Sequence, residues 1–314
     1  MKKRGYLLIL LITITLIIGC TQAPEEIPVI VEEPLVEEEI IPPEPADIKI
    51  ETQVEEVKEV VPEPIPEKDI DPNLVAHWTF DQDAQDSAKN NHGTIKGGAT
   101  IKDGKIGKAL YFDGVDDFVD FPQSTVEKIG SLGQGTIAFW FNYQSLLDKQ
   151  TIMPLFYIGM ASGDDNMYLI EIGHAAGTEG PPFGNFPDGT PDPNNKMIYS
   201  TWVKNNQEPF LCFDSNKNLE ENKWYHYAVV VGPDGNTGYL NGLAIANKDH
   251  NFGNPKAQSF LNSIIVQEKL TLGYGKSAYQ ISPDFEYFKG YIDDVRIYDR
   301  PLNAVEISKL TSLS

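Results

Sequence analysis

Positive charge is scarce in this chain, which has 314 residues with 46 Asp or Glu against only 25 Lys or Arg. The formal net charge is −21. Phosphates of nucleic acids are bound by clusters of basic side chains, and the sequence contains no such cluster beyond the three basic residues at its start. The composition therefore argues against nucleic acid as a partner.

The chain also lacks a long apolar run at its start. YLLILLITITLII has 13 residues, whereas a membrane-spanning helix needs about 20. This run follows Lys2-Lys3-Arg4 and ends at Gly19-Cys20, which resembles a bacterial-type lipoprotein signal. The resemblance implies cleavage before Cys20 and a diacylglycerol on its sulfur, although Ile18 is larger than usual. The alternative is an ordinary secretory signal or an uncleaved anchor.

Cysteine is almost missing, since Cys20 and Cys212 are the only two. An exported chain with one thiol left after lipidation has no intramolecular disulfide framework. Cys212 lies among apolar neighbours in PFLCFD, so it is predicted to be a buried small hydrophobe. The core alone must then stabilise the fold, and a domain of about 240 residues is large enough for that.

Residues 21–72 contain neither glycine nor an aromatic residue, but they contain 10 prolines and 17 acidic residues against 3 lysines. Proline removes backbone donors, and like charges extend the chain. We therefore predict a disordered acidic tether, about 160 Å long if it is fully extended as polyproline II. Its Val and Ile patches leave a strand-adding interaction motif as an alternative.

Residues 73–314 show little helical periodicity and many short strand patterns, such as LVAHWTF, TIAFWFNY and WYHYAVVV. Ile137, Phe139 and Phe141 share one face by period two, with Ala138 and Trp140 on the other. Asn241-Gly242 is a two-residue hairpin signal. Only PLNAVEISKL near the end has a helical period. The pattern predicts an all-β antiparallel sandwich of jelly-roll type with a short C-terminal helix.

Several of these segments, in this order, resemble the laminin-G-like, concanavalin A-like jelly-roll domains of exported microbial proteins. They are LVAHWTFD, GKALYFDGVDDFVDFP, GTIAFWF, WYHYAVVVGPDGNTGYLNG and GYIDDVRIYDRPLNAVEI. The resemblance extends over residues 74–311, essentially the whole domain. The resemblance implies the fold but no particular ligand, because members of the family bind sugars, bind proteins or are purely structural.

Catalytic motifs are missing. Retaining glycosidases of this fold carry Glu-x-Asp-x-x-Glu on one strand, with two carboxyls about 5 Å apart. Aligned on Asp293, this chain has Tyr291 and Arg296 at the two Glu positions. G-x-S-x-G and H-E-x-x-H motifs do not occur. We therefore expect a protein that is not an enzyme.

Calcium is the cofactor that the resemblance implies, as a structural ion joining the N- and C-terminal segments of the domain. The expected ligands are Asp86 and Asp293, with Asp81 next, since calcium prefers carboxylate and carbonyl oxygens. The loop reads DSAKNN, without the glycines that the family often has there. The alternative is that these carboxylates cap turns or pair with Arg296 and Arg300.

A second acidic group, FDGVDD, contains Asp113, Asp116 and Asp117. The sequence predicts a tight hairpin in which Gly114 supplies the special backbone angle and the carboxylates brace the turn.

The segment from Gly173 to Lys196 has no strand pattern and is rich in Gly, Pro and Asn. Loops this long in a compact domain are usually functional or disordered. An exposed ring beside amides and carboxylates suits a sugar. The candidate ligand-binding residues are His174, Phe183, Asn185, Phe186, Asp188, Asp192 and Trp202. The alternative is that the phenylalanines only pin the loop to the sandwich.

Taken together, the sequence predicts a lipid-anchored, extracytoplasmic protein, at the cell surface or in the periplasm, that presents a noncatalytic glycan-binding module. The expected partner is a polysaccharide or surface glycan. A structural or adhesive module that binds an envelope or cell-surface protein is the alternative.

Overall fold

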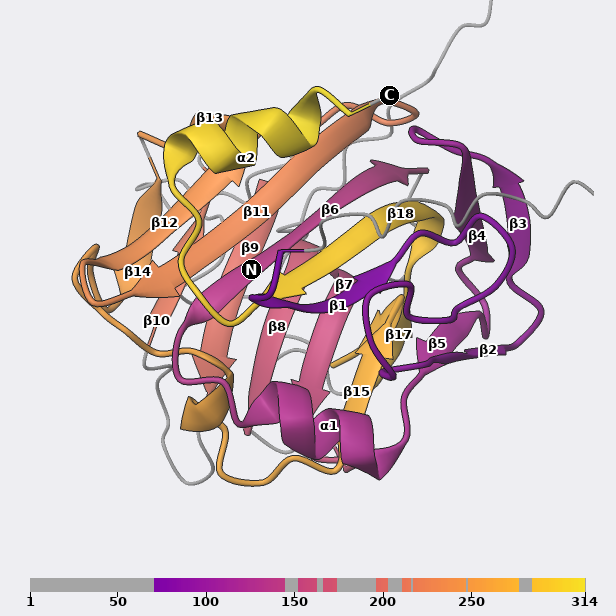
Figure 1. Ribbon diagram of the computed structural model, residues 1–314, viewed down its shortest axis with the longest axis horizontal. Coiled ribbons are helices and arrows are strands. Elements are labelled where there is room, and N and C mark those ends of the chain that lie inside the picture. The colour runs from indigo at the N-terminus through magenta and orange to yellow at the C-terminus, as the bar shows by residue number, and fades with distance from the viewer. Residues whose placement is uncertain are drawn as a thin grey trace, which may run out of the picture. The chain divides into compact units, whose positions relative to one another are not determined.

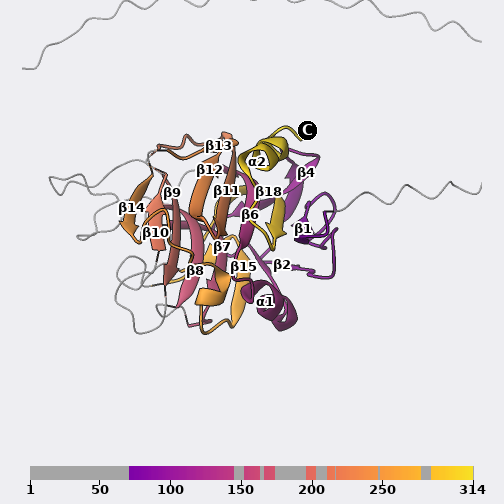
Figure 2. The ribbon, with the colours of Figure 1, turned by 60° about the vertical axis from the view of Figure 1, so that its left-hand side comes forward.

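Two antiparallel β-sheets pack face to face around the hydrophobic core (Figure 1). The structure is a computed structural model, and it describes residues 71–144, 152–162, 166–173, 196–202, 211–215, 217–246, 248–276 and 284–313. Figure 2 shows the two sheets as separate layers. The strand pairings are antiparallel, so the predicted all-β sandwich is confirmed.

The chain divides into two units, Met1–Val61 and Pro62–Ser314, and the described residues all belong to the second. The expected signal segment and nearly all of the expected tether lie outside the described residues, so their boundaries stay predictions. Within the described ranges, no helix has both the length and the apolar character needed to cross a membrane.

The first sheet joins the beginning and the end of the domain. Its order is β13-β12-β11-β6-β18-β4-β3, with β1 paired to β18. Because β18 pairs with β1, β4 and β6, the closing strand lies inside the sheet. The strands are β1 (Leu74–Trp78), β3 (Thr100–Asp103), β4 (Lys108–Asp113), β6 (Gly135–Tyr143), β11 (Trp224–Gly232), β12 (Gly235–Leu240), β13 (Leu243–Ala244) and β18 (Lys289–Tyr298).

The second sheet has the order β14-β10-β9-β8-β7-β15-β5-β2. Its strands are β2 (Thr94–Lys96), β5 (Phe118–Asp120), β7 (Ile152–Gly159), β8 (Met167–Gly173), β9 (Lys196–Trp202), β10 (Leu211–Asp214), β14 (Asp249–Phe252) and β15 (Lys269–Leu272). A separate two-stranded sheet, β16 (Tyr274–Gly275) and β17 (Glu286–Tyr287), follows β15 in the chain.

Strand β6 shows how the period-two pattern builds the core. Ile137, Phe139 and Phe141 belong to the main core cluster, as the alternation predicts. Ala138 belongs to a second cluster on the other face of the sheet. Every residue of β6 is buried, so the outer face of the first sheet is covered as well.

Helix α2 (Ala304–Thr311) provides part of that cover (Figure 1). Its Ile307 and Leu310 pack with Ala138, Ala228 and other residues of the second cluster. Asn303 begins the helix with a capping box: its side chain accepts the Val305 and Glu306 backbone N–H groups, and Glu306 accepts the Asn303 N–H. This is the C-terminal helix that the sequence predicts.

A second helix, α1 (Gln123–Gly130), was not predicted, because its apolar residues are few. Val126 and Ile129 are fully buried in the main core. One further turn, η1 (Leu261–Ser263), is a 3-10 helix. The Asn241-Gly242 hairpin is confirmed: both residues have positive φ, 52° and 78°, and they join the paired strands β12 and β13.

Candidate functional site

The predicted binding loop can be located only by its ends. His174, Phe183, Asn185, Phe186, Asp188 and Asp192 lie outside the described residues, so their role stays a prediction. Trp202 is the last residue of β9 and pairs with Met167 of β8. Gly173 pairs with both Lys196 and Ile152, so the loop leaves the second sheet where β7 begins.

Four half-buried aromatic rings lie on the outer side of the second sheet. They are Phe118, Tyr274, Phe285 and Tyr287, and we call them the aromatic cluster. Tyr274 stacks on Phe285, with ring centroids 4.8 Å apart and planes at 19°. The ring centroids of Tyr287 and Phe118 lie 4.7 Å and 4.9 Å from the Tyr274 centroid. Tyr157 is fully buried and contacts Phe285 at 5.7 Å, edge to face.

The backbone explains how these rings meet. Phe118 precedes Val119, which faces the main core, so alternation turns Phe118 outward on β5. Gly273 follows β15 with φ +78°, and a Cβ on it would lie 2.6 Å from the Phe112 ring. This turn leads the chain into β16, where Tyr274 pairs with Tyr287 of β17.

Charged groups border the aromatic cluster. The Lys269 Nζ lies 5.7 Å from the Phe118 centroid and 5.3 Å from the Tyr274 centroid, which is within cation–π range. Glu286 accepts the backbone N–H of Ile152 at 3.2 Å, so β17 is tied to the strand end beside the predicted loop. Burial, together with the neighbouring Tyr287, raises the pKa of Tyr274 to about 12, so its hydroxyl stays neutral.

The aromatic cluster is not among the sites that the sequence predicts. Phe118 lies more than 150 residues before the other three rings, and only strand pairing brings it to them. The available signal was the aromatic density of TLGYG and DFEYFKGY. Half-buried rings offer apolar faces, and tyrosine hydroxyls add polar edges, which is the combination that a sugar ring requires.

A second set of rings lies on the first sheet. Tyr111 and Tyr291 are 4.9 Å apart, and Trp224 is 5.8 Å from Tyr291. The Lys102 Nζ lies 3.3 Å from the Tyr111 centroid. These rings are also half-buried, but Tyr111 already donates a hydrogen bond to Gln144 at 3.2 Å.

Of the expected calcium ligands, Asp86 is the most fully occupied by hydrogen bonds. It is 5% exposed, and its Oδ1 accepts the backbone N–H groups of His77 and Ala88, both at 2.9 Å. Its Oδ2 accepts the backbone and side-chain N–H groups of Asn91 at 3.0 and 2.9 Å. Burial works to raise the pKa of Asp86, but these donors outweigh it, so the pKa lies below its ordinary value.

Asp293 is fully buried on β18. Its Oδ2 accepts the backbone N–H groups of Lys105 and Ile106 at 2.8 and 2.9 Å, while none of the described residues bonds to its Oδ1. Burial raises the pKa of Asp293 to about 7, with further contributions from the charges of Asp294 and Asp81.

Asp294 has a different environment because the pairing of β18 with β6 is interrupted between Asp293 and Arg296. Asp294 has φ 50° and lies 2.6 Å from His77 Nε2. The Arg296 guanidinium donates to it at 3.0 and 2.9 Å. Burial opposes ionisation, but His77 and Arg296 outweigh it and lower the pKa of Asp294.

The structure brings together only part of the expected calcium set. Asp81 accepts the Lys108 N–H at 2.9 Å, so Asp81 and Asp293 bind the same turn. Asp86 instead closes its own loop. Calcium at these three residues stays a prediction. Arg300 does not bind any of them, because it pairs with Asp71 and Glu306.

The β4–β5 hairpin shows the bracing bonds that the sequence predicts. Asp113 Oδ1 accepts the Val115 N–H at 2.8 Å, and Asp117 Oδ2 accepts the Asp113 N–H at 2.9 Å. Gly114 has φ +83°. Burial and the nearby charges of Asp113 and Asp116 raise the pKa of Asp117.

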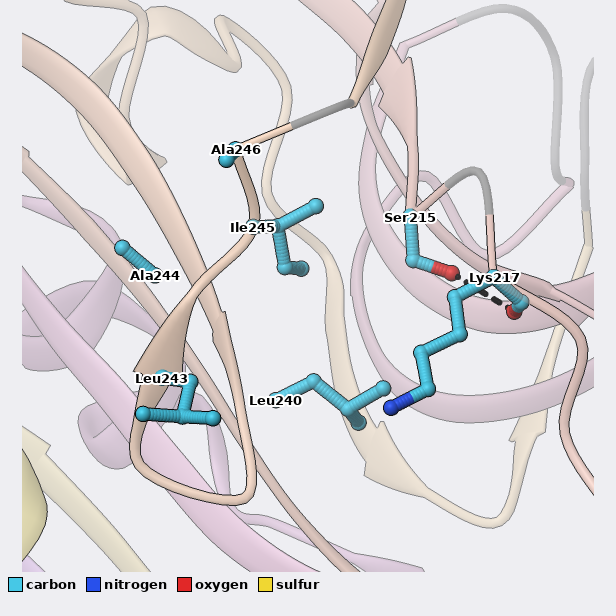
Figure 3. Close-up of a pocket in the computed structure, with 7 residues that line it drawn as sticks. All are labelled: Ser215, Lys217, Leu240, Leu243, Ala244, Ile245 and Ala246. Atoms are coloured by element: carbon cyan, nitrogen blue, oxygen red, sulfur yellow. Dashed lines mark hydrogen bonds between the residues drawn. The ribbon is translucent and has the colours of Figure 1, made fainter.

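A pocket of about 290 Å³ lies beside the β12–β13 hairpin (Figure 3). In Figure 3 the Lys217 side chain extends toward Leu240, and the Ser215 hydroxyl donates to the Lys217 carbonyl at 3.1 Å. The lining residues are Ser215, Lys217, Leu240, Leu243, Ala244, Ile245 and Ala246. None of them has a ring, so this pocket offers no stacking surface for a sugar.

The two positions that would hold glycosidase carboxyls have other contacts. Tyr291 packs against Tyr111 and Trp224, and Arg296 is bound to Asp294. Cys212 is buried, as the sequence predicts.

Residues 113–308 match the family model described as the concanavalin A-like lectin/glucanases superfamily. Comparison with curated proteins gave no match. The botulinum neurotoxin DC binding domain, solved in complex with rat synaptotagmin II, is 15% identical with a TM-score of 0.51. The alignment covers 77% of this chain and 52% of that chain, so this chain spans about half of that domain.

Two smaller structures align over nearly their whole length. Domain 4 of AbnA, a GH43 extracellular arabinanase from Geobacillus stearothermophilus in complex with arabinotriose, is 21% identical over 76% of this chain and 98% of that chain, with TM-score 0.48. The CBM40 of the Ruminococcus gnavus IT-sialidase, bound to α2,3 sialyllactose, is 16% identical over 68% of this chain and 100% of that chain, with TM-score 0.45. On its family match, the chain belongs to the concanavalin A-like lectin/glucanases superfamily.

Proposed function

We propose that this protein is a noncatalytic glycan-binding module whose binding surface is the aromatic cluster. The main support is the stack of half-buried rings, with Phe118, Phe285 and Tyr287 all within 5 Å of Tyr274. The apolar face of a sugar ring stacks on such a surface, and neutral tyrosine hydroxyls bind sugar hydroxyls.

The predicted loop extends this surface in our proposal. Its ends leave the sheet at Gly173 and Lys196, beside Ile152, which is bonded to Glu286 of the cluster's own strand. Phe183 and Phe186 would add rings, and Asn185, Asp188 and Asp192 would add hydroxyl partners.

Binding without turnover agrees with the chemistry of β18. A retaining glycosidase needs two carboxyls across the bond that breaks. Here Tyr291 is packed between aromatic neighbours, and Arg296 is held by Asp294. Neither position supplies the carboxyl that this mechanism needs.

We further propose that Cys20 carries a lipid anchor and that residues 21–72 hold the module away from the membrane. The support is the basic start, the short apolar run and the cysteine where that run ends. Replacement Cys20→Ser should release the protein from the membrane fraction and abolish labelling by radioactive fatty acid. A labelled, membrane-bound Cys20→Ser protein would contradict the anchor.

The glycan proposal is tested with a panel of polysaccharides in affinity gels. Retardation of the full chain by one polysaccharide class, with no release of reducing ends, is the expected result. Release of reducing sugar would show an enzyme instead. Capture of an envelope protein that no polysaccharide in the panel displaces would favour the structural or adhesive alternative.

A further inference from the structure

The β4–β5 hairpin brings three carboxylates to one point. Asp113 ends β4, Asp116 and Asp117 precede β5, and one oxygen from each lies within 4.8 Å of the others. Asp113 and Asp116 are exposed, while Asp117 is 3% exposed. Like charges at this spacing repel one another unless a proton or a cation lies among them.

A second observation concerns Asp117 alone. Its Oδ2 accepts the Asp113 N–H, but its Oδ1 is buried and has no hydrogen-bond partner among the residues that the structure describes. Buried carboxylate oxygens are normally paired, because an unpaired one has lost its hydration without compensation. The bracing of the turn therefore does not account for this oxygen, and a bound cation would.

Lys289 pairs with Asp113 across the strands and its stem lies against Gly114, but no ion pair joins it to the cluster among the described residues, and one side of the cluster is closed. The ion pairs found among the described residues use other carboxylates. The turn between β2 and β3 packs closely on the other side: a Cβ on Gly97 would lie 2.2 Å from the Asp116 carbonyl oxygen, and one on Gly98 would lie 3.7 Å from Asp117 Oδ1.

We propose that Asp113, Asp116 and Asp117 form a calcium site. A set of oxygen ligands without nitrogen or sulfur suits a hard divalent cation, and calcium completes its six to eight ligands with carbonyls and water. This group is distinct from the predicted set of Asp81, Asp86 and Asp293. Asp117 directly precedes Phe118, so calcium would also hold one ring of the aromatic cluster; only this consequence rests on the proposed function.

The test is calorimetric titration of calcium into the chelator-treated full chain in detergent. Asp116→Asn and Asp117→Asn should weaken binding by about tenfold or more, because affinity follows the number of charged ligands. The matched control is Asp234→Asn, which removes an exposed aspartate from the β11–β12 turn. It should leave the affinity unchanged. The readout needs no glycan, so a failure here is separate from a failure of glycan binding.

Thermal unfolding of the same proteins shows whether a variant loses calcium binding only because it is misfolded. In chelator, the unfolding midpoint of Asp117→Asn should be no lower than that of the wild type. The variant loses a charge that Asp113 and Asp116 repel, and its amide oxygen still accepts the Asp113 N–H. Calcium should raise the wild-type midpoint but not that of Asp117→Asn. No calcium binding by the wild type would overturn the proposal. So would loss of binding in Asp293→Asn with full binding in both hairpin variants.

Discussion

A helix and a turn cover part of the outer face of the first sheet and leave Tyr111, Trp224 and Tyr291 half-buried, whereas the half-buried rings of the second sheet form the aromatic cluster. On the first, Ile307 and Leu310 of α2 cover Ala138 and its neighbours. Trp140, beyond the helix, is 6% exposed with the Lys105 ammonium 5.0 Å from its ring. On the second, the rings around Tyr274 pack mainly on one another and keep part of their surface in solvent.

The covered apolar residues of the first sheet serve stability, whereas the half-exposed rings of the second sheet are available for binding. Apolar area that a helix covers stabilises the fold by about 25 cal/mol per Å², but it cannot meet a ligand. Rings that stay half exposed contribute less to folding and remain available for stacking. The covered face also buries Trp140 Nε1, His226 Nδ1 and Asp293 Oδ1, for which the described residues provide no hydrogen-bond partner. Burial shifts the pKa of His226 and of Asp293, so the stability of this face depends on pH.

The largest expected effect comes from uncovering the first sheet. Ile307→Ala should lower the free energy of unfolding by about 2–4 kcal/mol, because it opens a cavity at a fully buried position. Urea unfolding of the full chain measures this. Val305→Ala on the same helix is the control, since Val305 is 65% exposed and should change stability by about 0.5 kcal/mol or less. Equal losses in both variants would mean that α2 does not cover the sheet.

The next effect is the pH dependence that Asp293 introduces. Its pKa is about 7 in the folded protein against an ordinary 3.8, so the folded state binds the proton more tightly. The stability from this group is therefore present below pH 3.8 and lost as pH rises through about 7. In the wild type the free energy of unfolding should therefore fall between pH 5 and 8. In Asp293→Asn this fall should be smaller by roughly 1–3 kcal/mol.

Urea unfolding in chelator at both pH values measures this effect and keeps calcium out of the comparison. The exposed Asp103 provides the control variant, Asp103→Asn, which should keep the wild-type slope. An unchanged slope in Asp293→Asn would show that its burial does not govern the pH response.

The smallest expected effect is at the start of α2. Asn303→Ala removes the acceptor for the Val305 and Glu306 N–H groups and should lower the free energy of unfolding by about 1 kcal/mol. Asn303→Ser should restore most of the loss. A change as large as that of Ile307→Ala would mean that the cap, rather than the covered apolar area, holds the helix on the sheet.

Most of the fold could be predicted, because it follows from local patterns. The alternation in TIAFWFNY, the Asn241-Gly242 turn and the apolar period of the last helix are all readable in short windows. Helix α1 was missed because its two buried apolar side chains, Val126 and Ile129, make too weak a helical period.

The candidate site was less predictable, because its contacts join distant segments. The N–H donors to Asp293 come from residues almost 190 positions earlier, and the sequence does not show them. Asp86 could be recognised as important, but its four N–H donors depend on how the loop closes. The aromatic cluster likewise needs β5, β15, β16 and β17 to meet.

In this account the aromatic cluster on the second sheet, and not the half-buried rings of the first sheet, binds glycan. The most direct test is affinity electrophoresis of Tyr287→Ala beside Tyr291→Ala, which removes a half-buried tyrosine from the first sheet. We expect Tyr287→Ala to weaken retardation by on the order of tenfold, as the loss of one stacked ring should, and Tyr291→Ala to behave as the wild type. Weakening by Tyr291→Ala alone would contradict the account and move the binding surface to the first sheet.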